Sequence, residues 1–557
     1  MRIAATILTV ILTLGAACAP AATIYPDRWV YVSRNLSNDA QVEEMRAIIE
    51  TAAAHGLNGM LWAGGLDSMD RRPPEFFQRL ERVKAICAAN KIEIIPIIFS
   101  AGYGGGVLGH DANLAAGLPA KDLKFVVHKG EATLAPEAQP KLANPGFEDF
   151  RNGVFTGFVF QDKPGQISFV DQEVYHSGKA SLRFQNYAPG DPQTQHARVM
   201  AEVKVQPYAP YRVKVWVKTQ DFGPRDTLRM QVYVGSRNIG SANLASDPTS
   251  DWREVGMTFN AREADTVRIY VGAWGAATGK FWLDDLGVEA QGLRCVLRRP
   301  GTPVKVTSED GKTIYEEGRD FAPIADPRLG DFRGNHDDPP IRLLPGSRLQ
   351  EGDRLRVSFY HGVMPNDGQV SVCMSEPALY EYWAQQAKLI QQHLAPTKWF
   401  FSMDEIRAGG ACEACKSRHM TMGQILGDCI TREVQMVREV SPGAKCYVWS
   451  DMLDPNHNAH GDYYLVDGDF TGSWDYIPKD VVIACWYFQK RAESLRFLSE
   501  RGFETLAGAY YDGDDLENCK GWLAALDVTP KARGIMYTSW RDKYALLGPF
   551  GDLVSKR

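Results

Sequence analysis

The chain has 557 residues, so we expect two or three folding units instead of a single core. Aromatic residues make up 11% of the chain, charged residues make up 23%, and the formal net charge is -6. So small a net charge argues against a nucleic-acid partner or an acidic lipid surface, and it favours a neutral ligand.

The first 22 residues have the pattern of an export signal. Met1 and Arg2 precede an apolar run over residues 3–17, which is too short to span a membrane as a helix, and small residues follow it. Two processing outcomes stay open, namely cleavage near Ala21 or a lipoprotein signal in which Cys18 carries the lipid. We therefore expect an exported protein, which is periplasmic, secreted or held at the outer membrane through Cys18 alone.

Residues 24–125 alternate strand and helix patterns. β-rich runs occupy residues 29–33, 59–62 and 92–99, and helical periodicity fills the two intervals between them. The third run is almost continuously β-branched, which is typical of a strand buried on both faces of a parallel sheet. This pattern predicts the first three strands of a β/α barrel.

Residues 141–291 change to an all-β pattern, with alternating strands separated by Gly, Pro, Asp and Ser turns. We expect them to form a jelly-roll sandwich inserted after the third barrel strand. Residues 292–365 continue in the same style, and we expect a small β-rich excursion there.

Helix and strand patterns alternate again over residues 366–557. Three strands before the insertion and five after it make eight, the number that a closed barrel requires. The predicted fold class is α/β, a (β/α)8 TIM barrel interrupted after strand 3 by an all-β sandwich. The five later strands are predicted at residues 398–403, 445–450, 481–487, 504–510 and 534–539.

Functional groups of such barrels sit where the strands end, and these positions are rich in residues that suit sugars. Aromatic faces suit the C–H surface of a pyranose, while carboxylates and Arg suit its hydroxyls. One Trp at a strand end is more often core, but an aromatic beside a charge recurs over strands five to eight and favours a substrate site. The candidates are Arg34, His110, Trp449, Asp451, Trp486, Tyr511, Asp512, Trp540 and Asp542.

Asp404 and Glu405 follow a buried strand and are the candidate catalytic carboxyls. Glycoside cleavage needs an acid at the leaving oxygen and a second group that attacks the sugar or activates water. Adjacent strand residues point in opposite directions, so this pair is not expected to flank a glycosidic bond as acid and nucleophile. One solution is substrate assistance, in which Glu405 is the acid, the sugar's own 2-acetamido oxygen attacks, and Asp404 orients that amide.

The order and spacing of the strand-end residues resemble the family 20 glycoside hydrolases, which are β-N-acetylhexosaminidases, and their clan relatives. The resemblance covers residues from about 25 to 120 and from about 370 to 545. Two segments depart from it. The family has His-Gly-Gly before the Asp-Glu pair, where this chain has residues 401–403, and a His-rich end of the second strand, where this chain has residues 61–65. The resemblance rests on Ser33, Arg34, Gly109, His110, the entry to a helix at residues 373–377, Asp404, Glu405, Trp486, Tyr511, Asp512, Trp540 and Asp542.

This resemblance also implies roles for the surrounding residues. Arg34 and Asp542 would hold sugar hydroxyls, and His110 would support the region of the acid. Tyr511 would position the acetamido group together with Asp404. Trp486 and Trp540 would wall the pocket.

The insert has resemblances of its own. Residues 144–148, 176–183 and 281–286 resemble β-jelly-roll carbohydrate-binding modules, in which an opening Glu and a closing Asp often hold a structural calcium through oxygen ligands. By this resemblance Glu148 and Asp285 are candidate calcium ligands. No cofactor is expected for catalysis. The alternative is an interdomain sandwich that binds no ligand.

Ten cysteines are present, and one of them, Cys18, lies in the export signal. The nine that remain are an odd number at low density, which argues against a disulfide scaffold. Cys412 and Cys415 stand out by their spacing. They are interpreted either as a disulfide that staples the loop after the Asp-Glu strand or, with His419, as half of a zinc site.

The sequence therefore predicts a glycoside hydrolase for an oligosaccharide or polysaccharide, as an exo-β-N-acetylhexosaminidase with retaining, substrate-assisted catalysis. Two alternatives stay open. One is a barrel glycosidase for a non-acetamido sugar that uses Asp451 or Asp512 as the second carboxylate. The other is a non-catalytic glycan-binding surface protein.

Overall fold

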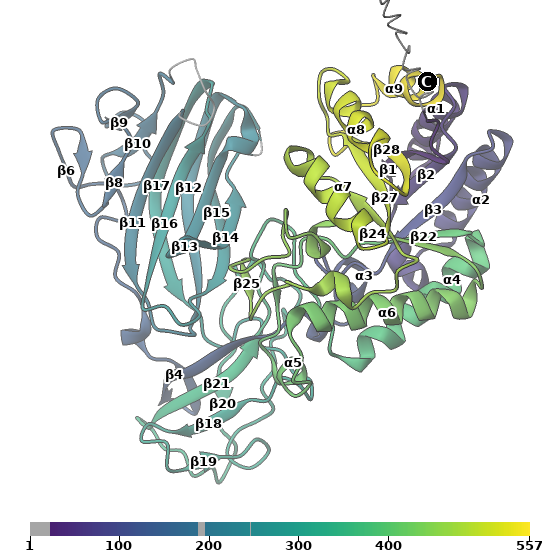
Figure 1. Cartoon of the computed structure of the whole chain (residues 1–557). Helices are drawn as coiled ribbons and strands as arrows, with labels where there is room; N and C mark the ends of the chain where they lie inside the picture. Colours follow the sequence, from purple (N-terminus) through teal and green to yellow (C-terminus); the bar gives the residue numbers. More distant parts are fainter. Residues whose placement is uncertain (1–22, 188–194, 246) are drawn as a thin grey trace, which may run out of the picture.

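The computed structural model describes residues 23–187, 195–245 and 247–557. The predicted export signal, with Cys18 and Ala21, lies outside the described residues. Within them, no helix is both long and apolar enough to cross a membrane. Figure 1 shows a barrel surrounded by helices on one side, a β-sandwich on the other, and a smaller sheet below the sandwich.

Eight parallel strands close into a barrel in the order β1-β2-β3-β22-β24-β26-β27-β28. The prediction of three strands early in the chain and five late in the chain is confirmed. The strands are β1 (Asp27–Ser33), β2 (Gly59–Ala63), β3 (Glu93–Ile98), β22 (Lys398–Phe401), β24 (Lys445–Trp449), β26 (Val482–Cys485), β27 (Glu504–Tyr510) and β28 (Ala532–Thr538).

Seven α-helices follow the barrel strands in the chain and bury one face each. Asn38 caps the first of them by accepting a hydrogen bond from the backbone of Gln41, and Thr421 with Gln424 forms a capping box at the start of α6. The helices are α1 (Asp39–Ala54), α2 (Pro74–Ala89), α4 (Pro377–Leu394), α6 (Met422–Val440), α7 (Arg491–Glu500), α8 (Glu517–Asp527) and α9 (Leu547–Ser555).

The connection from β24 to β26 departs from the barrel repeat. Residues 450–481 are all described, and they contain two 3-10 turns and the short strand β25 (Leu465–Val466) in place of an α-helix. β25 pairs with β23 (Ala408–Gly409) in the loop after β22. This pairing joins two loops at the carboxyl end of the barrel.

Side chains fill the barrel interior. Because the barrel is packed and not a pore, a ligand site must lie at its mouth. The interior cluster consists of Trp29, Tyr31, Leu61, Ile95, Phe400, Tyr447, Trp449, Val482, Ala484, Leu506 and Met536.

Between β3 and β22 the chain builds a sandwich of two five-stranded antiparallel sheets. Their facing sides carry one apolar core. The first sheet has the order β15 (Ser250–Asn260), β12 (Pro210–Gly223), β17 (Thr278–Ala290), β10 (Ser181–Phe184) and β9 (Ser168–Asp171). The second has the order β14 (Arg237–Asn243), β13 (Leu228–Val234), β16 (Thr266–Trp274), β11 (His196–Lys204) and β8 (Phe160–Gln161).

A six-stranded sheet joins the sandwich to the barrel. Strand β4 is the first strand of this sheet in the chain, and it lies partly inside the range 24–125 that we expected to belong to the barrel. It pairs with β21 and β5 and not with a barrel strand, so this expected boundary is corrected. The first part of the barrel therefore ends before Leu118. The sheet has the order β19 (Ile314–Tyr315), β18 (Lys305–Ser308), β21 (Arg354–His361), β4 (Leu118–His128), β5 (Glu131–Leu134) and β20 (Ile341–Arg342).

Candidate active site

A pocket of about 380 Å³ opens at the carboxyl end of the barrel strands. Its volume falls at the lower end of the range of small-molecule sites, about 300–1,000 Å³. Carboxyl, phenol and indole groups all line this pocket. Its lining includes Tyr31, Asp67, Tyr103, Asp404, Trp449 and Trp540.

An aromatic wall borders this pocket: Trp449 and Trp540 line it, and Tyr511 and Trp486 continue the wall beyond the lining. Trp540 lies 4.9 Å from Tyr31, 6.4 Å from Trp449 and 6.1 Å from Tyr511, between ring centroids. Tyr511 in turn stacks on Trp486 at 6.2 Å, with the rings almost parallel. Trp540 is 47% exposed and Tyr511 is 43% exposed, so both offer ring surface to a ligand.

Asp512 holds the turn that carries Trp540. Its carboxylate accepts hydrogen bonds from the hydroxyl of Ser539 at 2.6 Å and from the backbone N–H of Trp540 at 2.9 Å. Tyr510, Tyr511 and Asp512 all have positive φ angles, so this segment is strained for residues with side chains. Asp512 therefore positions the aromatic wall, which differs from its predicted place as a substrate contact or second carboxylate.

Asp404 faces the pocket. The strand expected over residues 398–403 ends at Phe401, and Asp404 lies in the turn beyond it. The hydroxyl of Ser402 donates to the Asp404 carboxyl at 2.9 Å. Burial, and then the negative charge of Glu405, raises the pKa of Asp404 to about 6. This carboxyl can therefore carry a proton near neutral pH.

Glu405 is held as a carboxylate. Its φ of 53° places it in the left-handed region, so the alternation of side chains along a strand does not apply to the Asp404–Glu405 pair. Glu405 accepts hydrogen bonds from the Tyr103 hydroxyl at 2.5 Å and from Gln369, and it pairs with Arg407 at 2.9 Å. Burial works to raise the pKa of Glu405, but the Arg407 charge and these hydrogen bonds outweigh it and lower the pKa.

Asp451 lies behind the pair instead of in the pocket lining. It is fully buried, and it accepts hydrogen bonds from the backbone N–H of Glu405 at 2.9 Å and from Asn458 at 3.0 Å. Burial, followed by repulsion from Asp404, raises the pKa of Asp451 to about 8. Asp451 therefore fixes the backbone of Glu405, whereas the sequence predicted a contact with substrate.

Arg34 and Asp542 meet at the closing point of the barrel, although more than 500 positions separate them in the chain. Their side chains form an ion pair at 2.7 Å, and Arg34 also pairs with Glu44 at 2.7 Å. The resemblance placed both residues on sugar hydroxyls. The structure brings them together outside the lining of the pocket.

His110 occupies a different place from the one predicted for it. It ends the short helix α3 (Gly105–His110), is exposed, and stacks on Tyr382 of α4 at 4.5 Å. The residue of this loop that reaches Glu405 is Tyr103. In the sequence, only its position in a Gly-rich loop after the third strand indicated that Tyr103 could contribute to the site. No pattern in the sequence indicated that Gln369 contacts Glu405.

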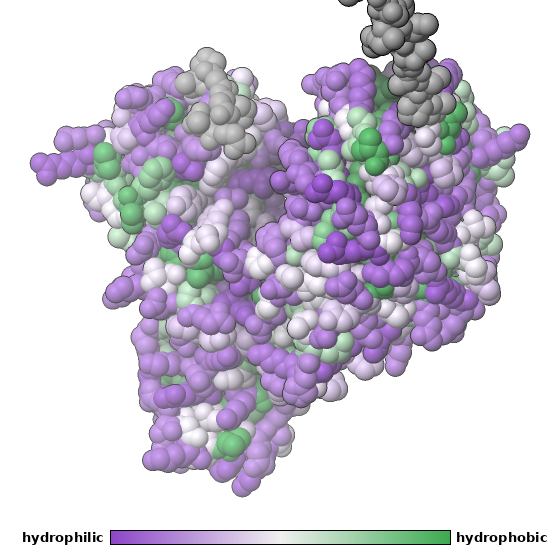
Figure 2. Space-filling view, viewed as in Figure 1, coloured by the Kyte–Doolittle hydropathy of each residue, from purple (hydrophilic) through white to green (hydrophobic). Residues whose placement is uncertain are grey.

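The sandwich contacts the loops at the mouth of the barrel through two ion pairs. Arg541, which follows Trp540, pairs with Asp226 of the sandwich at 2.8 Å. Arg262 of the sandwich pairs with Asp467 at 3.1 Å, next to β25. Figure 2 shows a recess lined by hydrophilic residues between the two bodies.

The two candidate calcium ligands lie near one turn of the sandwich. Glu148 accepts a hydrogen bond from the backbone of Lys179, and Asp285 accepts hydrogen bonds from His176 at 2.7 Å and Ser177 at 2.9 Å. Protein donors thus occupy these carboxylates, while calcium takes six to eight oxygen ligands. The calcium site stays a prediction.

Comparison with known proteins yields structural neighbours only, since no protein-family model and no curated protein matches the chain. A chitobiase of Flavobacterium johnsoniae is 8% identical with a TM-score of 0.37, and the match covers 95% of this chain and 48% of that one. A rhamnosidase of Novosphingobium sp. PP1Y is 10% identical with a TM-score of 0.31, over 93% and 55%. A family 16 carbohydrate-binding module is 18% identical with a TM-score of 0.19, over 26% and 97%. All three TM-scores are below 0.5, so these neighbours do not establish the fold or the activity. The fold is established by the strand pairing, and the proposed activity rests on the residues of the pocket.

Proposed function

We propose that the protein is a glycoside hydrolase that removes a terminal N-acetylated hexosamine from an oligosaccharide or polysaccharide, with retention of configuration. The observation that carries this proposal is the Asp404–Glu405 pair at an aromatic-walled pocket, in which the pKa of Asp404 is raised and that of Glu405 is lowered. We also propose that the chain is exported by its first 22 residues and that Glu148 and Asp285 contribute to a calcium site.

At a pH of about 6, which is the pKa of Asp404, the pair can hold one proton, and the substrate decides which carboxyl carries it. In the free chain the proton is on Asp404, because Arg407 keeps Glu405 ionised. The N–H of a 2-acetamido group needs an acceptor, so Asp404 loses its proton when it orients that group. The new negative charge on Asp404 raises the pKa of Glu405, which then takes up a proton and donates it to the leaving oxygen.

The surrounding carboxylates support the substrate as nucleophile. Asp451 is buried behind Glu405, and Asp512 is engaged with the Trp540 turn. The acetamido oxygen can supply the attacking group in their place, and Asp404 is next to Glu405 and able to orient it.

The test compares aryl β-N-acetylhexosaminides with aryl glycosides that lack the acetamido group. We expect turnover of the first set only. Glu405→Gln should lower kcat on a methylumbelliferyl substrate by about 10²–10⁴-fold, the usual contribution of a general acid, and much less on a dinitrophenyl substrate, whose leaving group needs no proton. Asp404→Asn should lower both rates, because orientation of the amide is lost.

One observation favours a second candidate, a glycosidase that uses two carboxylates. Asp67 lines the same pocket as Asp404, and its carboxylate accepts a hydrogen bond from the backbone of Gly106 at 2.8 Å. Equal turnover of substrates with and without the acetamido group, abolished by Asp67→Asn, would establish it. Binding without turnover of any glycoside, unchanged in Glu405→Gln, would identify a glycan-binding protein instead.

A further inference from the structure

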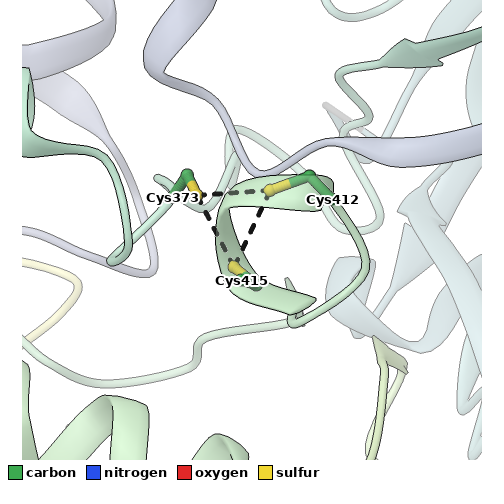
Figure 3. Close-up of side chains that lie close together, drawn as sticks. All are labelled: Cys373, Cys412 and Cys415. Atoms are coloured by element: carbon green, nitrogen blue, oxygen red, sulfur yellow. Dashed lines mark hydrogen bonds between the residues drawn. The ribbon is translucent and has the colours of Figure 1, made fainter. Parts of the chain in front are cut away.

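Three buried cysteines from two segments of the chain meet beside the loops that hold Glu405. Cys373 precedes α4, and Cys412 and Cys415 belong to the turn around the short helix α5 (Glu413–Lys416). Their Sγ atoms form a triangle with sides of 3.5, 3.7 and 3.7 Å, as Figure 3 shows. Cys373 and Cys412 are at most 2% exposed, and Cys415 is 5% exposed.

The shape of the triangle distinguishes a metal from a disulfide. Zn–S bonds of about 2.3 Å in a tetrahedron place the sulfur atoms about 3.8 Å apart, close to all three observed sides. A disulfide needs one S–S separation of about 2.05 Å and leaves the third sulfur outside the bond. The nearly equal sides therefore match one face of a zinc–thiolate tetrahedron.

Space and charge at this place also suit a cation. A cavity of about 10 Å³, close to the volume that one water needs, is bordered by all three cysteines. Three thiolates around a divalent ion leave one negative charge. The guanidinium of Arg299 lies 3.6 Å from the Cys412 sulfur and offsets that charge, and it also pairs with the buried Glu376 at 2.8 Å.

The other ligand-rich group among the described residues provides a contrast. Cys295, Asp326 and His336 lie within reach of one ion. However, one oxygen of Asp326 already accepts hydrogen bonds from the Cys295 backbone at 2.7 Å and from His336 at 2.9 Å. The three sulfurs contact one another, and the side-chain donor beside them is Arg299, a cation that suits a thiolate. His419, the partner expected from the sequence, is exposed and is not part of the cysteine group.

We propose that Cys373, Cys412 and Cys415 bind one Zn²⁺ ion, whose fourth position faces the small cavity and takes a solvent molecule. Soft thiolate ligands select zinc over calcium or magnesium. The ion links two segments that support the same carboxylate, since Gln369 lies four positions before Cys373 and Arg407 lies five before Cys412. Its role is structural, because it fixes the loops that hold Glu405.

The experiment measures metal in the purified full-length chain. We expect about one zinc per chain by plasma mass spectrometry, lost in Cys373→Ala and in Cys412→Ala. Cys87→Ala is the matched control, because Cys87 is an equally buried cysteine outside the cluster, and it should keep its zinc. Zinc chelation should lower the Tm of the unaltered chain and of Cys87→Ala, and it should leave the Tm of the Cys373→Ala chain unchanged.

Cobalt substitution decides the matter even if a variant fails to fold. The unaltered chain, stripped of metal and given Co²⁺, should develop the visible absorption of a tetrahedral cobalt thiolate. Failure to bind zinc or cobalt would overturn the proposal. So would an intact mass lower by two hydrogens, which marks a disulfide, or copper or iron in place of zinc. None of these readouts depends on glycosidase activity.

Discussion

The two ends of the barrel handle buried charge in opposite ways. At the amino end, the buried carboxylate of Asp27 accepts hydrogen bonds from Tyr447 at 2.7 Å and Arg533 at 2.6 Å, with Lys398 3.5 Å away. Lys398 also pairs with Glu93, and Arg533 also pairs with Glu504 at 3.2 Å, so negative and positive charges alternate there. At the carboxyl end, three neighbouring carboxyls share one nearby cation. They are Asp404, Glu405 and Asp451, and the cation is Arg407.

This difference suits the network at the amino end to a structural role and the network at the carboxyl end to proton transfer. Opposite charges at the amino end satisfy one another and hold strands of the barrel together. At the mouth, burial and then repulsion between the crowded carboxyls raise the pKa of Asp404 to about 6 and that of Asp451 to about 8, which costs stability and creates groups that exchange protons. Removing one charge at each end should therefore have opposite consequences.

The largest effect on stability is expected for Asp27→Asn. The change removes the carboxylate that Arg533 and Lys398 share, while Glu504 and Glu93 still pair with them. The free energy of unfolding should therefore fall by about 2–4 kcal/mol, somewhat below the cost of breaking a fully buried pair. Urea denaturation measures it, and kcat should be unchanged. Asp404→Asn is the matched control at the mouth, and it should lose activity without losing stability. Equal destabilisation by both changes would contradict the comparison.

A pH-dependent effect on stability is expected for Asp451→Asn. The pKa of Asp451 is raised to about 8 in the fold, while an unfolded Asp titrates near about 4. Its contribution to stability is therefore full below pH of about 4 and is lost as the pH rises towards about 8. Asn keeps an oxygen for the Glu405 backbone and has no charge, so its contribution does not change with pH.

Thermal unfolding at two pH values measures this difference. The Asp451→Asn chain should have a Tm a few degrees above that of the unaltered chain at pH of about 8, and the gap should narrow towards pH of about 4. A gap of the same size at both values would show that the carboxyl does not titrate as stated.

The smallest effect is expected where the sandwich meets the mouth. Arg541 and Asp226 are 62% and 50% exposed at their side chains, so Arg541→Ala should lower stability by about 1 kcal/mol or less. If the sandwich helps to hold longer glycans, KM should rise for an oligosaccharide but not for an aryl monosaccharide. An equal rise for both would place Arg541 at the pocket itself.

The sequence predicted the barrel because its evidence is local. Each strand is a short β-rich run, and the count of eight needs no knowledge of side-chain packing. The aromatic wall was predicted for the same reason, since Trp449 ends a strand and Trp486, Tyr511 and Trp540 follow strand ends. The β24–β26 connection departs from the alternation of strands and α-helices. Sequence periodicity alone did not reveal that 3-10 turns and a short strand replace the helix there.

The arrangement around Glu405 depends on contacts that no local pattern encodes. Tyr103 and Gln369 reach it from residues far away in the chain, and its left-handed backbone follows from the turn after Phe401. For the same reason His110 was placed wrongly, and Cys373 was not recognised as the neighbour of Cys412. Distant segments converge there because the barrel closes.

The order of the strands also bears on how the molecule folds. β3 must pair with β22, so its edge stays open until the chain from Ile98 to Lys398 has been synthesised and brought back. The sandwich can form in that interval as an independent unit, whereas β4 must wait for β21. An unpaired strand edge invites association with other chains. We therefore expect intermediates lacking the last five barrel strands to aggregate, and chains truncated before Lys398 to contain a folded sandwich beside an unfolded barrel fragment.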